Sequence, residues 1–239
     1  MRDMSEFDIL ILAGLYNSGP DHWQSHWEAA FPNMRRVQQD DWDRPIYADW
    51  ARCLSEAVDR CTKPVLLIAH SLGTSLVMRW AHTAKIQAVA GAFLVAPSDQ
   101  DLFENDPNPP RASDGSRYFR TRGFSPMLLQ SLPFPSMVLA SRNDECVSFE
   151  RAQTFAKAWG SYLVDVGALG HIGSAAKLGL WPQGLVWLGQ FIGSLPPHSP
   201  ATNGVTSPVP YSDLSELRVA VFACAREPSL NYLVGTGEE

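Results

Sequence analysis

The stretch LLIAHSLGTSLVMRWA, residues 66–81, changes character abruptly at its centre. The apolar run over residues 65–69 is typical of a buried strand, and residues 75–79 have the spacing of a helix with one apolar face. Between them stands HSLG, residues 70–73, without the Pro, Asn or Asp of an ordinary turn. The strand therefore meets the helix at a tight corner, and a serine occupies that corner.

Short apolar runs and amphipathic segments alternate on both sides of this corner. The apolar runs contain few polar residues, which is typical of strands buried on both faces of a parallel sheet. We expect strands at residues 7–13, 65–69, 89–95, 136–140 and 162–166, with a weaker candidate at 36–38. Helical spacing marks residues 23–30, 47–60, 75–82, 149–159 and 184–192. The alternation predicts the α/β class, with a doubly wound, mostly parallel sheet of about six strands.

Two segments break this alternation. Residues 97–123 form a long polar excursion rich in Asp, Asn, Pro, Arg and Gly, which we expect to run over the surface, close to the site. From residue 194 the sequence SLPPHSPATNGVTSPVPYSDLSE is typical of a linker, although residues 217–224 are apolar enough to dock somewhere. We therefore expect a catalytic domain over residues 1–195 and an extension of unknown role over residues 196–239.

Composition narrows the class of protein and its partners. Of the 239 residues 45% are hydrophobic and 18% charged, which is ordinary for a globular protein. The net charge is −6 and the Lys and Arg residues are scattered, which argues against nucleic acid or an anionic membrane as the main partner. The oligomeric state is left open.

Cysteine usage and the first residues indicate a cytoplasmic protein. The four cysteines show neither CxxC nor Cys/His metal spacing, so we interpret them as reduced thiols: Cys53, Cys61, Cys146 and Cys224. The apolar stretch near the start follows acidic residues and is too short for a signal peptide or a membrane span.

The corner resembles the nucleophile elbow G-x-S-x-G, with Ala69 in place of the first glycine. Alanine is small enough to allow the tight turn, which would push the Ser71 hydroxyl into the cleft at the carboxyl end of the strand. A serine at this place is also a common helix N-cap, so the motif alone leaves both interpretations open.

Two later strand ends supply the partners that a nucleophilic serine needs. A serine hydroxyl requires a base, and the base requires a carboxylate to orient it. The strand at 136–140 is followed by Asp144, and the strand at 162–166 is followed by His171. The order serine, acid, histidine is that of the α/β-hydrolases, so we predict a Ser71–Asp144–His171 triad.

Other residues compete for these roles. Glu145 is a rival acid, and Asp144 also fits a helix cap. His70 is too close to Ser71 in sequence to fold back as its base, so we interpret it as a packing or hydrogen-bonding residue. His22 and His26, one turn apart, lack a third metal ligand, and no metal or cofactor is predicted.

An oxyanion hole needs two N–H groups aimed at one point. The backbone of Leu72, directly after the serine, is expected to supply one. The loop AGLYNSGPDHW after the first strand is expected to supply the other, from Leu15 or Tyr16. The alternative is that this loop is only a glycine-rich turn.

Several motifs carry a family resemblance: NSGPDHWQSHWE, DWDRP, AHSLG, LPFPS, SRND with SFERA, and GHI with LGLWPQG. In this order they resemble the small YdeN-type serine hydrolases, relatives of the retinoblastoma-binding-protein-like hydrolases in the α/β-hydrolase superfamily. The resemblance implies a compact hydrolase fold without the superfamily's first two strands, and a triad at Ser71, Asp144 and His171. Two positions depart from the bacterial pattern, because Gly173 replaces an Asn and Leu180 replaces an acidic residue.

The expected reaction is hydrolysis of a small ester, thioester or amide through an acyl-enzyme on Ser71. Trp23, Trp27 and Trp181 are candidates for the wall of the substrate pocket, although tryptophan is also a common core residue. The alternative function is a hydrolase-shaped module that binds a protein partner. A complete triad argues against it, since binding alone does not require all three residues.

Overall fold

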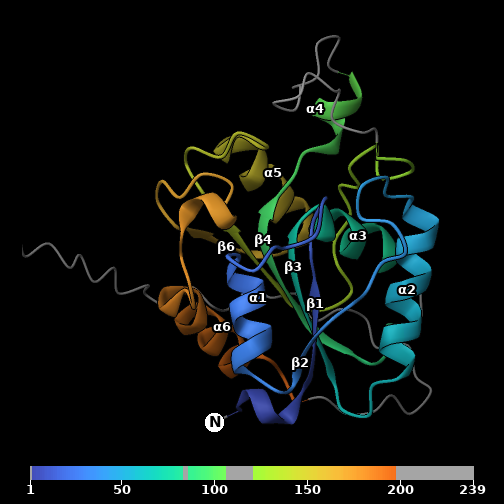
Figure 1. The fold of residues 1–239 in the computed structure, drawn as a ribbon, viewed down its shortest axis with the longest axis vertical. Coiled ribbons are helices and arrows are strands. Elements are labelled where there is room, and N and C mark those ends of the chain that lie inside the picture. Colours follow the sequence, from blue (N-terminus) through green and yellow to red (C-terminus); the bar gives the residue numbers. More distant parts are fainter. Residues whose placement is uncertain (1, 83–85, 106–120, 198–239) are drawn as a thin grey trace, which may run out of the picture. The chain divides into compact units, whose positions relative to one another are not determined.

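The computed structural model describes residues 2–82, 86–105 and 121–197 (Figure 1). The strands are β1 Asp8–Leu12, β2 Met34–Arg36, β3 Val65–Ser71, β4 Val89–Pro97, β5 Ser136–Ala140 and β6 Tyr162–Asp165. The α-helices are α1 Trp23–Ala30, α2 Tyr47–Asp59, α3 Leu72–Trp80, α4 Gln100–Asn105, α5 Phe149–Trp159 and α6 Pro182–Ser194, with short 3-10 helices at Met4–Glu6 and Ser174–Ala176.

The described strands form one six-stranded sheet in the order β2-β1-β3-β4-β5-β6, and every neighbouring pair is parallel. The predicted α/β class and sheet are therefore confirmed. The weak strand candidate is real but lies two residues earlier than expected, because Met34 pairs with Ile9 of β1.

Alternating side chains of the strands enter two separate cores. Ile9 and Ile11 of β1 pack with the side of the sheet that α1 and α6 cover, whereas Leu10 and Leu12 pack on the side of α2, α3 and α5 (Figure 1). This alternation buries the strands on both faces, which explains why they read as unbroken apolar runs.

Local signals explain how the helices begin and end. α5 has the bounds expected from the sequence, because the Ser148 hydroxyl accepts a hydrogen bond from Arg151 N and Gly160 ends the helix with φ 69°. α3 begins at Leu72, three residues before the apolar spacing becomes visible. The helix therefore starts directly at Ser71, with no turn residues between it and β3.

Parts of both irregular segments lie outside the described residues. The segment 97–123 includes the short helix α4, and its residues 106–120 are not described. The proposed linker and extension are described only as far as residue 197, so the predicted boundary at residue 195 stays a prediction. Helix α6 ends at Ser194. Among the described helices, none combines the length and apolar character of a membrane span.

Candidate active site

The candidate site lies where the order of the strands reverses, so that the helices after two neighbouring strands cover opposite faces of the sheet. β1 stands beside β3, and the chain leaves β1 toward α1 on one face but leaves β3 toward α3 on the other. Ligands of open α/β sheets bind at such switch points, outside the carboxyl ends of the strands. Ser71 is the last residue of β3 and therefore stands at this point.

The backbone of Ser71 is strained, with φ 53° and ψ −122°. A non-glycine residue in such a conformation persists only where its surroundings impose it, and it is common at functional sites. Two glycines make room for the turn. A Cβ on Gly14 would lie 2.8 Å from the Cβ of Ser71, and a Cβ on Gly73 would lie 2.6 Å from the Leu12 carbonyl oxygen. The elbow is thus pressed directly against the end of β1.

Gly73→Ala should damage the site because the added methyl group has no room against the β1 backbone. We expect a loss of about 1–3 kcal/mol in the free energy of unfolding. Moving the start of α3 by a fraction of an ångström should also lower turnover, on the order of 10²-fold. The control is Gly189→Ala on α6, where an added Cβ meets nothing within 4 Å. Chemical denaturation and ester hydrolysis measure both effects, and equal results for the two variants would contradict the packing argument.

The three predicted residues form a hydrogen-bonded chain. The Ser71 hydroxyl lies 2.7 Å from Nε2 of His171, and Nδ1 of His171 lies 2.9 Å from both carboxylate oxygens of Asp144. With Nδ1–H donating to the carboxylate, Nε2 is left to accept the serine proton. The carboxylate that contacts His171 is therefore that of Asp144, whereas the rival acid Glu145 is exposed.

Two loop residues hold the loop that carries His171. The Ser141 hydroxyl donates to Asn143 Oδ1, 2.9 Å away, and accepts a hydrogen bond from the backbone N–H of Leu169 at 2.9 Å. Asn143 Oδ1 also accepts a hydrogen bond from Gly170 N at 2.8 Å. The loop after β5 thus positions both Asp144 and the residues that precede His171.

The environment of His171 has opposing effects on its protonation. Burial lowers the pKa of His171, but its hydrogen bond to Asp144 and its contact with the Cys146 thiol outweigh burial and raise that pKa above the ordinary histidine value. The Asp144 side chain is fully covered, so little solvent screens this interaction. The protonated form of His171 is therefore stabilised.

The raised pKa predicts the pH dependence of turnover. Only neutral His171 accepts the Ser71 proton, so activity should fall as the pH decreases through a pKa above 6.5, the ordinary histidine value. Replacing Asp144 with Asn removes the carboxylate that raises this pKa, so the acid limb should move to lower pH. The measurement is kcat/KM against pH for both proteins. An acid limb at the same pH in the variant would show that Asp144 does not set the pKa.

The other two histidines near the site, His70 and His22, stay neutral and have structural contacts. Burial strongly lowers the pKa of His70, and burial followed by the charge of Arg36 lowers the pKa of His22 to about 3. Nε2 of His70 donates to the backbone carbonyl of His171, 2.8 Å away. Nδ1 of His22 accepts a hydrogen bond from Gln24 N and so caps α1.

The three tryptophans predicted as pocket walls lie in the core. Trp23, Trp27 and Trp181 are only 1%, 0% and 3% exposed. The Trp23 indole donates to the Ile172 carbonyl, 2.9 Å away, and the Trp27 indole donates to the Leu180 carbonyl at 2.7 Å. Their rings contact one another beneath the histidine loop. They therefore support the loop after His171 and do not present a substrate surface.

The oxyanion candidates differ in whether their N–H groups are free. The N–H of Leu72 belongs to the first turn of α3, where backbone donors have no partner within the helix. The N–H of Tyr16 donates to the Trp42 carbonyl, 3.0 Å away, and is therefore engaged elsewhere. Gly14 packs against Ser71, and Leu15 follows it directly. The backbone N–H of Leu15 is therefore the first-loop candidate for the second oxyanion donor.

Comparison with known proteins shows the family of this chain. The model of the serine hydrolase family matches residues 9–190. A YdeN-like hydrolase from Pectobacterium atrosepticum is 34% identical, with a TM-score of 0.67, over 79% of this chain and 92% of that one. The chain belongs to the serine hydrolase family. The predicted resemblance to YdeN-type hydrolases is thereby confirmed, and the family supports a hydrolase activity.

More distant solved structures share the fold. The ydeN product of B. subtilis is 20% identical, with a TM-score of 0.54 over 77% of this chain and 98% of that one. An esterase domain from Rhodothermus marinus is 16% identical, with a TM-score of 0.55 over 78% of this chain and 88% of that one. No curated protein gave a significant match.

Two departures from the YdeN pattern lie beside the histidine loop. Gly173 precedes the 3-10 helix Ser174–Ala176, and a Cβ there would lie 3.9 Å from Nε2 of His22. This buried nitrogen has no hydrogen-bond partner among the described residues. Leu180 is 48% exposed and contributes its carbonyl to the Trp27 indole.

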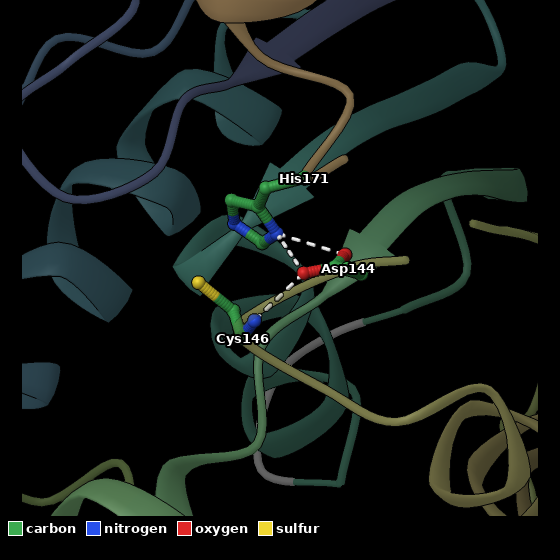
Figure 2. Close-up of side chains that lie close together, drawn as sticks. All are labelled: Asp144, Cys146 and His171. Atoms are coloured by element: carbon green, nitrogen blue, oxygen red, sulfur yellow. Dashed lines mark hydrogen bonds and ion pairs between the residues drawn. The ribbon is translucent and has the colours of Figure 1, made fainter. Parts of the chain in front are cut away.

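Sequence reasoning missed Cys146 as a neighbour of His171. It lies two residues after Asp144, and its backbone N–H donates to Asp144 Oδ1, 2.8 Å away. The thiol points toward the imidazole of His171 (Figure 2). The only hint in the sequence is that Cys146 stands two residues after Asp144. The pattern of strand ends locates the acid, but it does not show which of the following residues lies near the histidine.

Proposed function

We propose that this serine hydrolase cleaves a small carboxylic ester through an acyl-enzyme on Ser71. The observation that carries the proposal is the continuous chain from the Ser71 hydroxyl through His171 to Asp144, with distances of 2.7 and 2.9 Å. These distances are within the reach that proton transfer requires. The strained elbow supports the proposal, since strain of this kind is stored where chemistry needs it.

Acylation begins when Ser71 Oγ attacks the ester carbonyl carbon and its proton passes to Nε2 of His171. Asp144 holds the opposite nitrogen and stabilises the imidazolium. The negative charge on the carbonyl oxygen is stabilised by the N–H groups of Leu72 and Leu15. His171 then returns the proton to the leaving alcohol as the ester C–O bond breaks, and the acyl group remains on Ser71.

Deacylation repeats these steps with water. His171 removes a proton from the water molecule, whose oxygen attacks the acyl carbon, and the proton then passes to Ser71 as the acid leaves. Acyl transfer by such a triad needs no metal or organic cofactor. Thioesters and amides are cleaved by the same chemistry, and amides are slower because the amine is the poorer leaving group.

A panel of p-nitrophenyl esters with acyl chains of increasing length tests this function. The protein should release p-nitrophenol with a burst that approaches one equivalent when deacylation is slow, as expected for an acyl-enzyme. Intact-protein mass spectrometry should then show the acyl adduct. Absence of turnover on every ester, thioester and anilide tested would contradict the proposal and leave the alternative of a binding module.

A further inference from the structure

Next to the proposed nucleophile, three side chains with metal-binding atoms converge. Asp144, Cys146 and His171 each offer one such atom, and these atoms all lie within 4.8 Å of one another. Figure 2 shows the Cys146 thiol and the Asp144 carboxylate next to the imidazole of His171, with the carboxylate hydrogen-bonded to the ring. Among the described residues this is the group that brings together three different donor types.

Backbone geometry fixes this arrangement before any ion arrives. The N–H of Cys146 donates to Asp144 Oδ1 at 2.8 Å, so the residue that carries the thiol also holds the carboxylate. Nδ1 of His171 is held 2.9 Å from the same carboxylate. A preorganised donor set pays less ordering entropy on binding than flexible surface side chains do.

The exposure of the three groups gives an ion a route in from solvent. Cys146 is partly exposed and the His171 side chain is 17% exposed, whereas the Asp144 side chain is fully covered. An ion can therefore reach the imidazole from solvent, whereas the carboxylate is covered.

We propose that Asp144, Cys146 and His171 form an inhibitory binding site for a soft divalent cation, with Zn²⁺ as the metal that fits the donors. Thiolate, imidazole and carboxylate are the ligands that zinc takes in proteins, and three protein ligands leave a fourth position for water. Mg²⁺ and Ca²⁺ prefer all-oxygen sites, so the thiol and imidazole discriminate against them.

Metal binding and proton transfer compete for the same imidazole ring. Zinc on Nδ1 of His171 takes the place of the proton that this nitrogen shares with Asp144, so the neutral ring carries its proton on Nε2 and cannot accept the Ser71 proton. The carboxylate that binds zinc also no longer orients the ring. The inhibition thus rests on the proposed function, whereas the binding does not.

The other described cysteines lack these partners. Cys61 lies beside the Arg35 guanidinium, with 3.6 Å between Nη2 and Sγ, and Cys53 has the same distance to Arg52. A neighbouring cation disfavours a metal ion. Cys61 is also partly exposed, which makes Cys61→Ser a matched control for Cys146→Ser.

Cobalt tests the binding without depending on activity. Titration of the full chain with Co²⁺ should produce the near-ultraviolet absorption of a thiolate–cobalt bond, and Zn²⁺ should remove it. The Cys61→Ser variant should behave like the parent, and Cys146→Ser should lose the band.

A second readout uses the unmodified chain: Zn²⁺ should slow alkylation of Cys146 by iodoacetamide, mapped by mass spectrometry, and leave the alkylation rate of Cys61 unchanged. No band in the parent, or no selective protection of Cys146, would overturn the site.

Ester hydrolysis tests the inhibition, with each variant scaled to its own metal-free rate. Zn²⁺ should inhibit the parent and Cys61→Ser at concentrations at least tenfold below those needed for Cys146→Ser. EDTA should restore the rate, and Mg²⁺ should have no effect. Equal zinc sensitivity of the two variants would overturn the inhibitory role. A chain that binds Co²⁺ through Cys146 but hydrolyses no ester would contradict the proposed function and leave the metal site standing.

Discussion

Ser71→Ala should reduce ester hydrolysis on the order of 10⁶-fold, the loss seen when a triad nucleophile is removed. The substitution deletes the one atom that forms the covalent bond to the acyl group. Alanine has nearly the same volume as serine, so the core around the elbow should pack as before. The residual rate should match that of water attacking a bound ester.

The matched control is Ser75→Ala, on the next turn of α3. Its buried hydroxyl lies 3.6 Å from the sulfur of Met127 and has no contact with His171. This variant should keep turnover within a few-fold of the parent. Circular dichroism should show both variants folded. A folded Ser71→Ala protein with undiminished turnover would remove Ser71 from the mechanism.

Asp144→Asn should lower the acylation rate by about 10⁴-fold, as expected when the acid of a triad is neutralised. The asparagine side chain still fits, and its oxygen can accept the Cys146 N–H, so the loop should keep its shape. Its amide nitrogen, however, cannot accept the Nδ1–H of His171. The ring then favours the tautomer with the proton on Nε2, which cannot take the Ser71 proton.

Glu145→Gln is the control for this substitution, because it neutralises the adjacent, exposed carboxylate. It should change the acylation rate by less than about tenfold, as is usual for an exposed charge that makes no specific contact. Stopped-flow measurement of the p-nitrophenol burst gives the acylation rate directly. The reverse ranking of the two variants would assign the acid role to Glu145.

The fold was predictable because its signals are local and repeated. Val65 to Ala69 are each 0% exposed. A strand buried on both faces is a continuous apolar run, so the sequence pattern identifies it easily. The same order of strands places Ser71 at the end of β3, Asp144 after β5 and His171 after β6, and parallel strands bring these ends to one edge of the sheet. The candidate site therefore followed from chain order and residue type.

The features of the site that could not be predicted from the sequence depend on contacts between distant segments. The burial of Trp23 is set by the loop after His171, to whose backbone its indole donates. The N–H of Tyr16 is engaged by Trp42, a residue in another loop. The closeness of Cys146 to His171 depends on the turn that Asp144 makes. No periodicity encodes any of these pairings.

The central claim is that the Ser71 hydroxyl is activated by its neighbours, and a fluorophosphonate probe tests it most directly. Such a probe reacts with a serine whose proton is being removed and leaves ordinary hydroxyls unmodified. The folded chain should take up one probe, on the peptide that contains Ser71, and neither Ser71→Ala nor the denatured parent should be labelled. An unlabelled folded parent, or a label that persists in Ser71→Ala, would contradict the account.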